Sequence, residues 1–174
     1  KLDQVVALKL LRPDVGRDVE RVERLKKEVR LSRLVTHRNV ARIYDIGEWE
    51  GGEFVCMEFL PGQTLGRRID QEGALPEAEL RDILVQLCDG LAAAHEVEVM
   101  HRDLKPSNVI LAPDGRVVIL DFGLARAYTG ISRRLTGSGE LLGTPQYMAP
   151  EQITGEPVDH RADLYALGVV AYEM

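Results

Sequence analysis

His101-Arg-Asp-Leu-Lys-Pro-Ser-Asn108 is the stretch from which the fold of this chain can be inferred. Two short apolar runs follow it, Val109–Leu111 and Val117–Leu120, with the turn-forming sequence Pro113-Asp-Gly115 between them. Directly after the second run comes Asp121-Phe-Gly123. If the two runs pair as a hairpin, Asn108 at its start and Asp121 at its end lie side by side at the open end.

The polar residues around this hairpin have the chemistry of a metal–phosphate site. Asp103 and Lys105 precede the hairpin, so two carboxylates, an amide oxygen and an ammonium group would converge at one strand end. Oxygen ligands of this kind suit a Mg²⁺ ion that also binds phosphate. The alternative is a cluster of polar turn residues that merely solvates the hairpin.

Composition and charge restrict the classes of protein to which the chain can belong. Its 174 residues suggest one domain or part of a larger one, and a hydrophobic content of 45% supports a sizeable core. The net charge of −6, without a dense Lys/Arg tract, gives no reason to expect nucleic acid. Cys56 and Cys88 both lie in apolar runs, which predicts reduced core thiols in a cytosolic protein. No signal peptide or membrane-spanning stretch is visible.

The apolar pattern predicts an α+β fold in which strands come first and helices later. We expect a buried strand over Val5–Leu11, a helix over 17–35, strands over 43–47 and 54–59, and helices over 65–71, 76–97 and 159–174. Residues 127–143 show no periodicity, which predicts a mobile loop. Both chain ends fall inside apolar segments without capping signals, so we expect the sequence to be an excerpt.

Taken in order, the motifs resemble those of the eukaryotic-type Ser/Thr protein kinases, and most closely the bacterial branch. The likeness covers nearly the whole chain and rests on Val6-Ala-Leu-Lys9, Glu28, Phe54-Val-Cys-Met-Glu58, His101–Asn108, Asp121-Phe-Gly123, Gly143–Glu151 and Asp163–Gly168. It implies a two-lobed protein-kinase-like fold, truncated at both ends, with a partial kinase domain over residues 1–174. Residues 1–60 would form a β-rich N-lobe from the third strand to the hinge, and residues 61–174 a helical C-lobe through the start of the long central helix.

The resemblance implies an enzyme that transfers the γ-phosphoryl group of ATP to Ser and Thr hydroxyls of proteins. Asp103 would accept the proton of the substrate hydroxyl and orient it for in-line attack. Lys105 would neutralise charge on the transferred phosphoryl group. The Gly-rich loop and the later helices of the family lie outside this sequence, so we expect these 174 residues alone to be weakly active or inactive.

The same resemblance assigns residues to the nucleotide phosphates and the metal. Lys9 would bind the α- and β-phosphates of ATP, and Glu28 would hold Lys9 in place. Glu20 and Glu23 lie on the same predicted helix, but the spacing of Glu28 from the following His37 segment fits the family better. Asn108 and Asp121 would bind the Mg²⁺ or Mn²⁺ ions that bridge the phosphates.

The adenine ring would lie between the two lobes. By the resemblance, Ala7 packs on one face of the ring and Ile110 on the other, and Met57 forms a wall of the pocket. The backbone from Glu58 to Leu60 would be the hinge that forms hydrogen bonds with adenine. From the residues alone, Met57 is equally well explained as a core side chain.

Two aromatic residues of the central motifs are expected to pack rather than react. We interpret His101 as a buried core histidine and Phe122 as a hydrophobic side chain that switches position between states. Asp163 would accept hydrogen bonds from the backbone of the 101–108 loop. Glu151 would pair with an arginine that lies outside this chain.

The segment after Phe122 is predicted to regulate activity. Thr136 and Ser138 match the usual phosphorylation positions of bacterial relatives, although Thr129 and Ser132 remain alternatives. A phosphate there would gain charge-assisted contacts with Arg102 and order the loop. Self-association would then serve autophosphorylation.

The combination of Lys105 with Gly143-Thr144-Pro145 resembles the Ser/Thr-specific pattern rather than the tyrosine-specific one. Thr144 would form a hydrogen bond near Asp103 and Lys105 and so link peptide binding to catalysis. The expected partners are thus ATP and a protein with Ser or Thr, without nucleic acid and without membrane contact in this segment. The location is expected to be cytoplasmic, even if the parent protein is membrane-anchored elsewhere.

Two other functions are compatible with the resemblance. The first is a pseudokinase that acts as a binding scaffold; such relatives usually lack at least one of the four residues Lys9, Asp103, Asn108 and Asp121, and all four are present here. A small-molecule phosphotransferase on a related fold would not need the segment Gly143–Glu151, which is typical of a peptide-binding surface.

Overall fold

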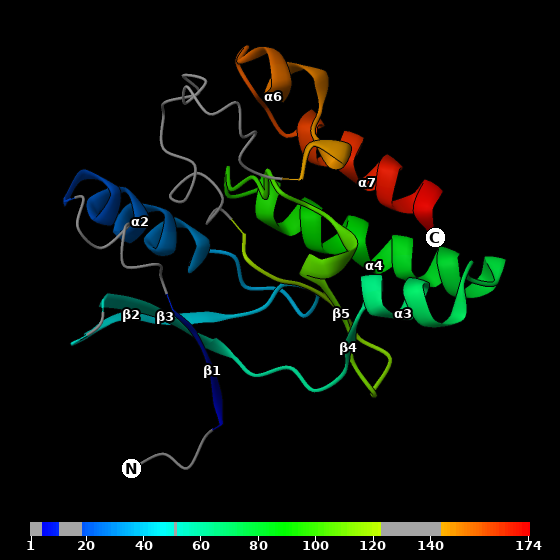
Figure 1. The fold of residues 1–174 in the computed structure, drawn as a ribbon, viewed down its shortest axis with the longest axis horizontal. Helices are drawn as coiled ribbons and strands as arrows, with labels where there is room; N and C mark the ends of the chain where they lie inside the picture. Colours follow the sequence, from blue (N-terminus) through cyan, green and yellow to red (C-terminus); the bar gives the residue numbers. More distant parts are fainter. Residues whose placement is uncertain (1–4, 11–18, 51, 123–143) are drawn as a thin grey trace.

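The computed structural model describes residues 5–10, 19–50, 52–122 and 144–174. They form a smaller β-rich part and a larger, mainly helical part (Figure 1). This arrangement is the predicted two-lobed α+β fold.

The smaller part is an antiparallel sheet with one helix. Its strands are β1 (Val6–Leu10), β2 (Ile43–Trp49) and β3 (Gly52–Glu58), in the order β1-β3-β2. Helix α2 (Val19–Ser32) lies on one side of this sheet (Figure 1). Val29 of α2 packs with Val55 and Met57 of β3, because these buried side chains form one apolar cluster. The predicted helix over 17–35 therefore exists and ends at Ser32, three residues early.

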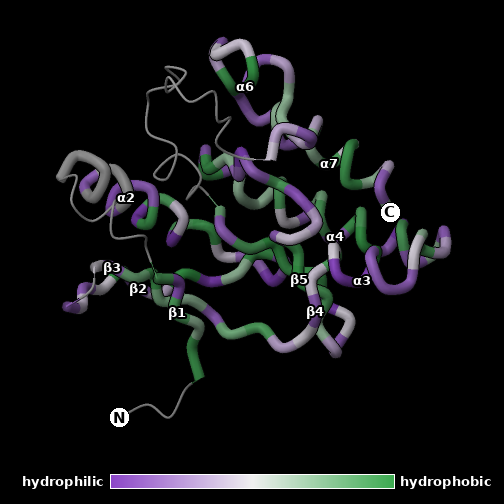
Figure 2. Tube along the Cα trace, viewed as in Figure 1, coloured by the Kyte–Doolittle hydropathy of each residue, from purple (hydrophilic) through white to green (hydrophobic). Residues whose placement is uncertain are grey.

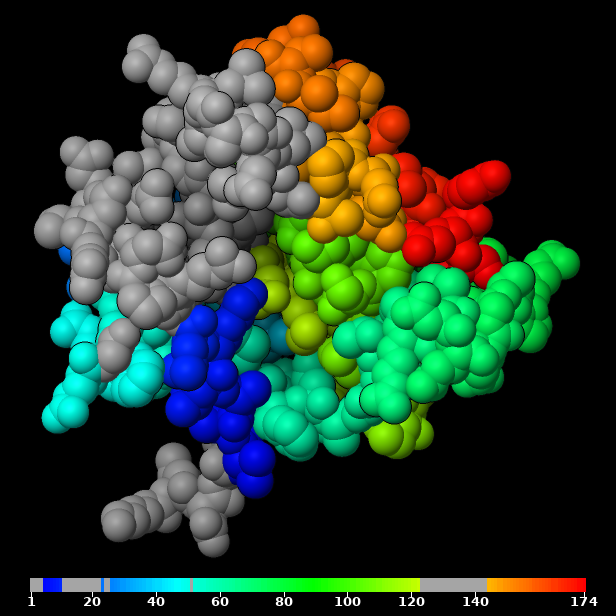
Figure 3. All heavy atoms as spheres, in the orientation of Figure 1, coloured from blue at the N-terminus to red at the C-terminus, as the bar shows by residue number. Residues whose placement is uncertain are grey.

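The prediction that β1 is a buried strand is wrong. Val6, Leu8 and Leu10 are 37%, 55% and 59% exposed, and β1 lies on the surface in Figure 3. Among the described residues β1 pairs only with β3, so it is an edge strand and nothing described covers its outer face. The side chains of β1 alternate between the two faces, and Ala7 and Lys9 share the less exposed one.

The larger part combines helices with a second sheet. Its helices are α3 (Leu65–Glu72), α4 (Glu77–His95), η1 (Pro106–Asn108), η2 (Pro145–Tyr147), α6 (Pro150–Thr154) and α7 (Arg161–Glu173). Its sheet has the order β4-β5-β6, with β4 (Gln63–Thr64), β5 (Val109–Leu111) and β6 (Val117–Ile119). β5 and β6 are antiparallel, with Val109 opposite Ile119, so the hairpin predicted from the sequence is confirmed.

The main core lies between α4, α7 and the β5–β6 hairpin. Fully buried apolar side chains from all of these elements meet there, namely Leu87, Leu91, Leu104, Val109, Ile119 and Val170. Figure 2 shows hydrophobic stretches along α4, α7 and β5, which supply residues to this core. Gly90 lets α4 pack closely against the segment that contains Asn39, because a Cβ atom at position 90 would lie 3.0 Å from the Asn39 carbonyl oxygen.

The segment after α2 joins the two parts to each other. The Ile119 N–H donates to the Asn39 carbonyl, and the Ala41 N–H donates to the Ile119 carbonyl, both at 2.9 Å. The buried Asn39 side chain donates to Gln86 on α4 at 2.8 Å and to the Val117 carbonyl at 2.7 Å. The β6 strand is thus fixed between α4 and this segment.

The two cysteines are not both core residues. Cys56 is half-buried in β3, but Cys88 is exposed on the outer side of α4, so the prediction of a core thiol is wrong for Cys88. The helical period was correctly identified, but Cys88 falls at the edge of the apolar stripe whose buried members are Ile83, Leu87 and Leu91. In the part of the chain that the structure describes, we find no helix with the length and apolarity needed to cross a bilayer.

Candidate active site

The β5–β6 hairpin brings the two central motifs together. The Leu120 N–H donates to the Asn108 carbonyl at 2.8 Å, so the last backbone contact of the hairpin lies one residue before Asp121. Asn108 and Asp121 therefore lie at the same open end, as the sequence predicts. The preceding Lys105 carbonyl accepts from the Asn108 N–H at 2.9 Å, which closes the one-turn helix η1 at this end.

Asp103 lies at the centre of a small polar network. Its Oδ2 is 2.9 Å from Lys105 Nζ and 3.3 Å from Asn108 Nδ2, and Asn108 Nδ2 also donates to the Asp103 carbonyl at 2.9 Å. Lys105 Nζ donates to Thr144 Oγ1 at 3.1 Å, so the predicted contact of Thr144 is present. The Asp103 side chain is 30% exposed, which leaves its carboxylate both oriented and accessible.

Asp121 is held from the other lobe. Its Oδ2 is 2.7 Å from Lys9 Nζ of β1, across 112 positions of sequence. Asp121 also adopts φ 61°, a left-handed conformation that is uncommon for a residue other than glycine. Glu28 is half-buried on α2, and its expected pairing with Lys9 stays a prediction.

The oxygen atoms at this end fit a divalent cation that carries phosphate. Asp121 Oδ1 is buried and accepts no hydrogen bond in the described structure. The Asn108 Nδ2 is engaged by Asp103, which leaves the Asn108 Oδ1 for a cation. Among the described residues no three His, Cys, Asp or Glu side chains are grouped closely enough to hold a metal alone. Such a two-residue site suits Mg²⁺, which takes few protein ligands and completes its shell with water and phosphate.

The residues expected around adenine lie near the junction of the two parts. Ala7 is opposite Met57 in the β1–β3 register, and Ile110 is half-buried on β5. Met57 is 8% exposed and belongs to the apolar cluster of the smaller part. The Glu58 N–H donates to the Arg42 carbonyl at 2.8 Å, so an adenine contact at Glu58 would have to use its carbonyl oxygen. Leu60 is half-buried in the otherwise exposed segment between β3 and β4.

Asp163 at the start of α7 organises the backbone of the 101–108 loop. It is 1% exposed and accepts from the His101 N–H at 2.8 Å and the Arg102 N–H at 2.7 Å, as predicted. Sequence reasoning missed its third partner, His95 on α4, whose Nε2 is 2.8 Å from Asp163 Oδ2. It also missed Gln152, whose Nε2 donates to the Arg102 carbonyl at 2.9 Å. Neither His95 nor Gln152 belongs to one of the motifs identified in the sequence.

These contacts make Asp163 a source of pH-dependent stability. Burial alone would raise the pKa of Asp163, but the His95 hydrogen bond, the nearby His101 and the two backbone N–H groups together lower it. A lowered folded-state pKa stabilises the fold above the unfolded value of about 3.9 and stops doing so as the pH falls through the folded value.

We therefore expect Asp163→Asn to reduce the free energy of unfolding by about 2–4 kcal/mol at pH 7, because one amide oxygen cannot serve all three donors. The difference from the wild type should shrink as the pH falls below about 4, because the unfolded wild-type chain then takes up a proton at Asp163 before the folded chain does. Urea unfolding of both proteins at pH 7, 5 and 3.5 measures this. A difference that grows on acidification would contradict the expectation.

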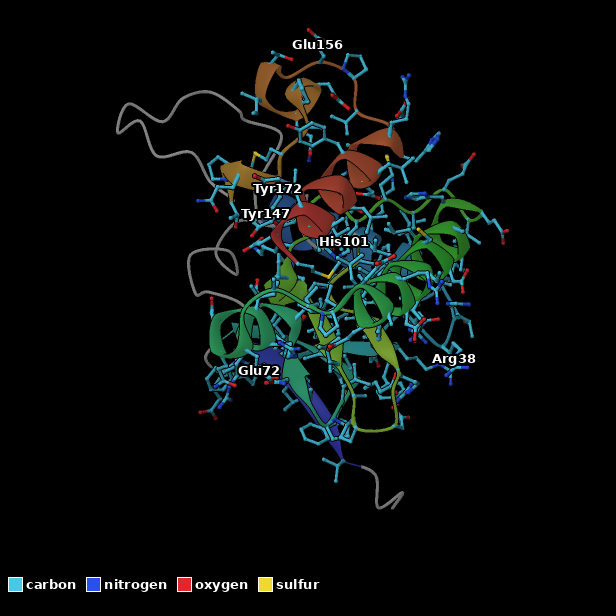
Figure 4. All side chains as sticks on the ribbon, turned by 90° about the vertical axis from the view of Figure 1, so that its right-hand side faces the viewer. Arg38, Glu72, His101, Tyr147, Glu156 and Tyr172 are labelled. Atoms are coloured by element: carbon cyan, nitrogen blue, oxygen red, sulfur yellow. The ribbon has the colours of Figure 1, made fainter. Side chains whose placement is uncertain are left out.

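The two aromatic residues pack as expected. His101 is completely buried, and its Nε2 lies 2.7 Å from the Leu120 carbonyl oxygen. Phe122 is 2% exposed and meets the His101 ring edge-on, with centroids 4.9 Å apart and planes at 70°. Figure 4 shows His101 in the interior, while Arg38 and Glu156 lie at the periphery. Their burial makes both rings structural supports of the site.

The residues predicted to regulate activity are only partly within the described structure. Arg102 is half-buried and adopts φ 66°. Thr136, Ser138 and the alternatives Thr129 and Ser132 lie outside the described residues, as does the loop predicted over 127–143. Glu151 is half-buried at the start of α6 and forms no ion pair among the described residues.

Comparison with known proteins supplies a family for this geometry. The family model described as "Protein kinase domain" matches residues 1–174. The chain is 35% identical over 173 residues to the probable serine/threonine-protein kinase PknB of Corynebacterium glutamicum, covering 97% of this chain and 27% of that protein. It is 39% identical over 180 residues to the serine/threonine-protein kinase pkn3 of Myxococcus xanthus, covering 99% of this chain and 33% of that protein. The chain thus spans about a third or less of these two relatives.

A solved structure agrees with the sequence comparison. The crystal structure of the Mycobacterium tuberculosis PknI kinase domain matches with a TM-score of 0.76 and 31% identity. The match covers 95% of this chain and 61% of that chain.

Proposed function

This chain belongs to the protein kinase domain family, and on that basis we propose that it transfers the γ-phosphoryl group of ATP to Ser and Thr hydroxyls of proteins. The observation that carries the proposal is the network in which Asp103 Oδ2 lies 2.9 Å from Lys105 Nζ and Lys105 Nζ lies 3.1 Å from Thr144 Oγ1. This network brings a carboxylate, an ammonium group and a threonine hydroxyl together, which supports the proposal.

Asp103 acts on the attacking hydroxyl, and Lys105 acts on the transferred phosphoryl group. Asp103 accepts a hydrogen bond from the substrate hydroxyl and takes its proton while the oxygen attacks the γ-phosphorus. The bond from that phosphorus to the bridging oxygen of ADP breaks, and ADP leaves with the electron pair. Lys105 stabilises negative charge on the phosphoryl oxygens during transfer. Because the transition state is loose, positioning of the hydroxyl contributes more than the basicity of Asp103.

Lys9, Asn108 and Asp121 hold the phosphates and the metal. Mg²⁺ or Mn²⁺, when bound, neutralises charge on the β- and γ-phosphates and orients them. Asn108 Oδ1 and Asp121 Oδ1 are the protein atoms that would bind it, and Lys9 would contact the α- and β-phosphates with Glu28 as its support. Ala7, Met57, Ile110 and the backbone from Glu58 to Leu60 would enclose adenine.

The remaining roles concern regulation and location. Phosphorylation of Thr136 or Ser138, by a second copy of the protein, would engage Arg102. Thr144 links the peptide-binding segment to Lys105, and Phe122 changes position between active and inactive states. We place the reaction in the cytoplasm, where ATP is available and the thiols of Cys56 and Cys88 stay reduced.

A transfer assay tests the proposed function. The full-length protein, γ-labelled ATP, Mg²⁺ and an unfolded protein substrate should yield label on Ser and Thr but not on Tyr. Chelation of the metal with EDTA should abolish it, because the proposed site binds the phosphates through the cation.

The same assay separates the alternatives. Nucleotide binding without any transfer would support a binding scaffold, and label found on small hydroxylated molecules but not on protein would support a small-molecule phosphotransferase. Either result would overturn the proposal.

A further inference from the structure

Ser32 at the end of α2 makes a buried contact that links this helix to the Asp121-Phe122 segment. The Ser32 residue is 4% exposed, and its hydroxyl donates to the Phe122 carbonyl oxygen at 2.7 Å. The two residues are 90 positions apart in sequence. The same hydroxyl lies 2.9 Å from the carbonyl oxygen of Glu28, one helical turn earlier.

A serine hydroxyl has one proton, so these two acceptors compete for it or share it. The contact with the Glu28 carbonyl is the local bond that serine often forms within helices. The contact with the Phe122 carbonyl is the shorter one and joins two separate elements. If α2 moves away, the Ser32 hydroxyl keeps the Glu28 carbonyl as a partner, but the buried Phe122 carbonyl loses this hydrogen bond and its desolvation is no longer compensated by Ser32.

The backbone at Asp121 needs such support. Its φ of 61° is sparsely populated by residues other than glycine, and such conformations persist where neighbouring contacts hold them. Lys9 holds the Asp121 side chain at 2.7 Å, and His101 packs on the Phe122 ring. Ser32 adds a contact to the main chain directly after Asp121, and it comes from the helix that carries Glu28.

We propose that Ser32 is a positioning residue that holds the Phe122 carbonyl, and through it the Asp121 carboxylate, in the orientation that receives the metal-bound phosphates. The role in catalysis rests on the proposed kinase function, whereas the link between α2 and Asp121 does not.

Substitution of Ser32 by Ala in the full-length protein tests the link. Alanine favours helix more than serine does, so α2 should form and the variant should fold. The matched control is Thr154→Ala, since within the described residues the Thr154 hydroxyl bonds to carbonyls of its own helix, those of Pro150 and Glu151. Ser32→Thr serves as the conservative variant because it keeps a hydroxyl at the same position.

The first readout requires no catalysis. Amide hydrogen exchange of peptides covering residues 119–122 should be faster in Ser32→Ala than in the wild type, and unchanged in Thr154→Ala. The affinity for a fluorescent ADP analogue should fall about five- to tenfold in the presence of Mg²⁺, as expected for the loss of one buried hydrogen bond. In EDTA the affinity should equal that of the wild type, because adenine does not touch this segment.

The second readout is kinetic. In Ser32→Ala the Mg²⁺ concentration for half-maximal transfer should rise by about the same factor, and Ser32→Thr should restore it at least in part. Unchanged exchange and an unchanged Mg²⁺ requirement in Ser32→Ala, or equal changes in Thr154→Ala, would overturn the proposal. A wild-type protein that transfers no phosphate would contradict the kinase function alone, because exchange and ADP binding still decide the role of Ser32.

Discussion

Replacing Asp103 by asparagine should lower kcat for phosphoryl transfer about 10²- to 10⁴-fold, while the KM for ATP changes little. The amide cannot take the proton of the substrate hydroxyl, and it presents N–H groups where Lys105 Nζ lies 2.9 Å from the carboxylate. Asp103 makes none of the predicted contacts with adenine or the metal, so nucleotide affinity should be preserved. Initial rates of γ-label transfer to an unfolded protein substrate, at saturating Mg²⁺ and varied ATP, provide both constants.

The control for this substitution is Asp89→Asn. Asp89 is exposed on α4, so the same change of charge occurs outside the polar network. Its kcat should stay within about twofold of the wild type, in line with the small effects of most surface substitutions. Equal loss in both variants would show a general effect of net charge, and no loss in either would defeat the assignment of Asp103 as proton acceptor.

The sequence predicted the parts of the site whose residues are brought together by a local hairpin or belong to a recognisable motif. A hairpin between Asn108 and Asp121 follows from two apolar runs and a Pro-Asp-Gly turn, and the Leu120–Asn108 hydrogen bond is its structural counterpart. The contact of Asp163 with the loop and that of Thr144 with Lys105 came from the resemblance, and both are present. In each case the residues belong to a recognisable sequence motif, and the motif predicts how they are arranged.

Residues without a motif could not be found in this way. His95 and Gln152 are ordinary members of α4 and α6, and only the packing of these helices brings them to Asp163 and to the Arg102 carbonyl. Ser32 lies on the buried face of α2, and its polar partner Phe122 is 90 residues away in the sequence. Helical periodicity identifies the buried face of a helix and leaves open what lies opposite it.

The exposure of side chains was the other property that the local sequence pattern predicted wrongly. β1 has the composition of a buried strand, yet Leu8 is 55% exposed, because burial depends on what covers the strand and not on its own sequence. The same holds for Cys88, which lies at the edge of the α4 stripe. The apolar periodicity therefore predicts the helices and strands, whereas the burial of each face depends on the elements that pack against it.

Asp121→Asn should reduce kcat/KM for Mg·ATP by roughly 100-fold or more, through loss of metal binding. The Asp121 carboxylate can interact with two positive charges, Lys9 and a divalent cation. Its Oδ2 is 2.7 Å from Lys9 Nζ, and its buried Oδ1 accepts no hydrogen bond in the described structure. An amide at this position removes the negative charge that both Lys9 and a divalent cation would use. Isothermal titration of ADP with and without Mg²⁺ should show a loss of affinity only when Mg²⁺ is present.

Asp114→Asn is the matched control, because Asp114 lies on the same hairpin at its opposite, turn end and pairs there with Arg116. That variant should bind Mg·ADP as the wild type does, whereas raising the Mg²⁺ concentration should partly restore activity in Asp121→Asn. Rescue by metal distinguishes a weakened ligand from a misfolded site, since excess cation compensates for affinity but not for lost structure. If the two variants titrated alike, the open end of the hairpin would have no special part in binding the cation, and the kinase mechanism drawn from it would fail.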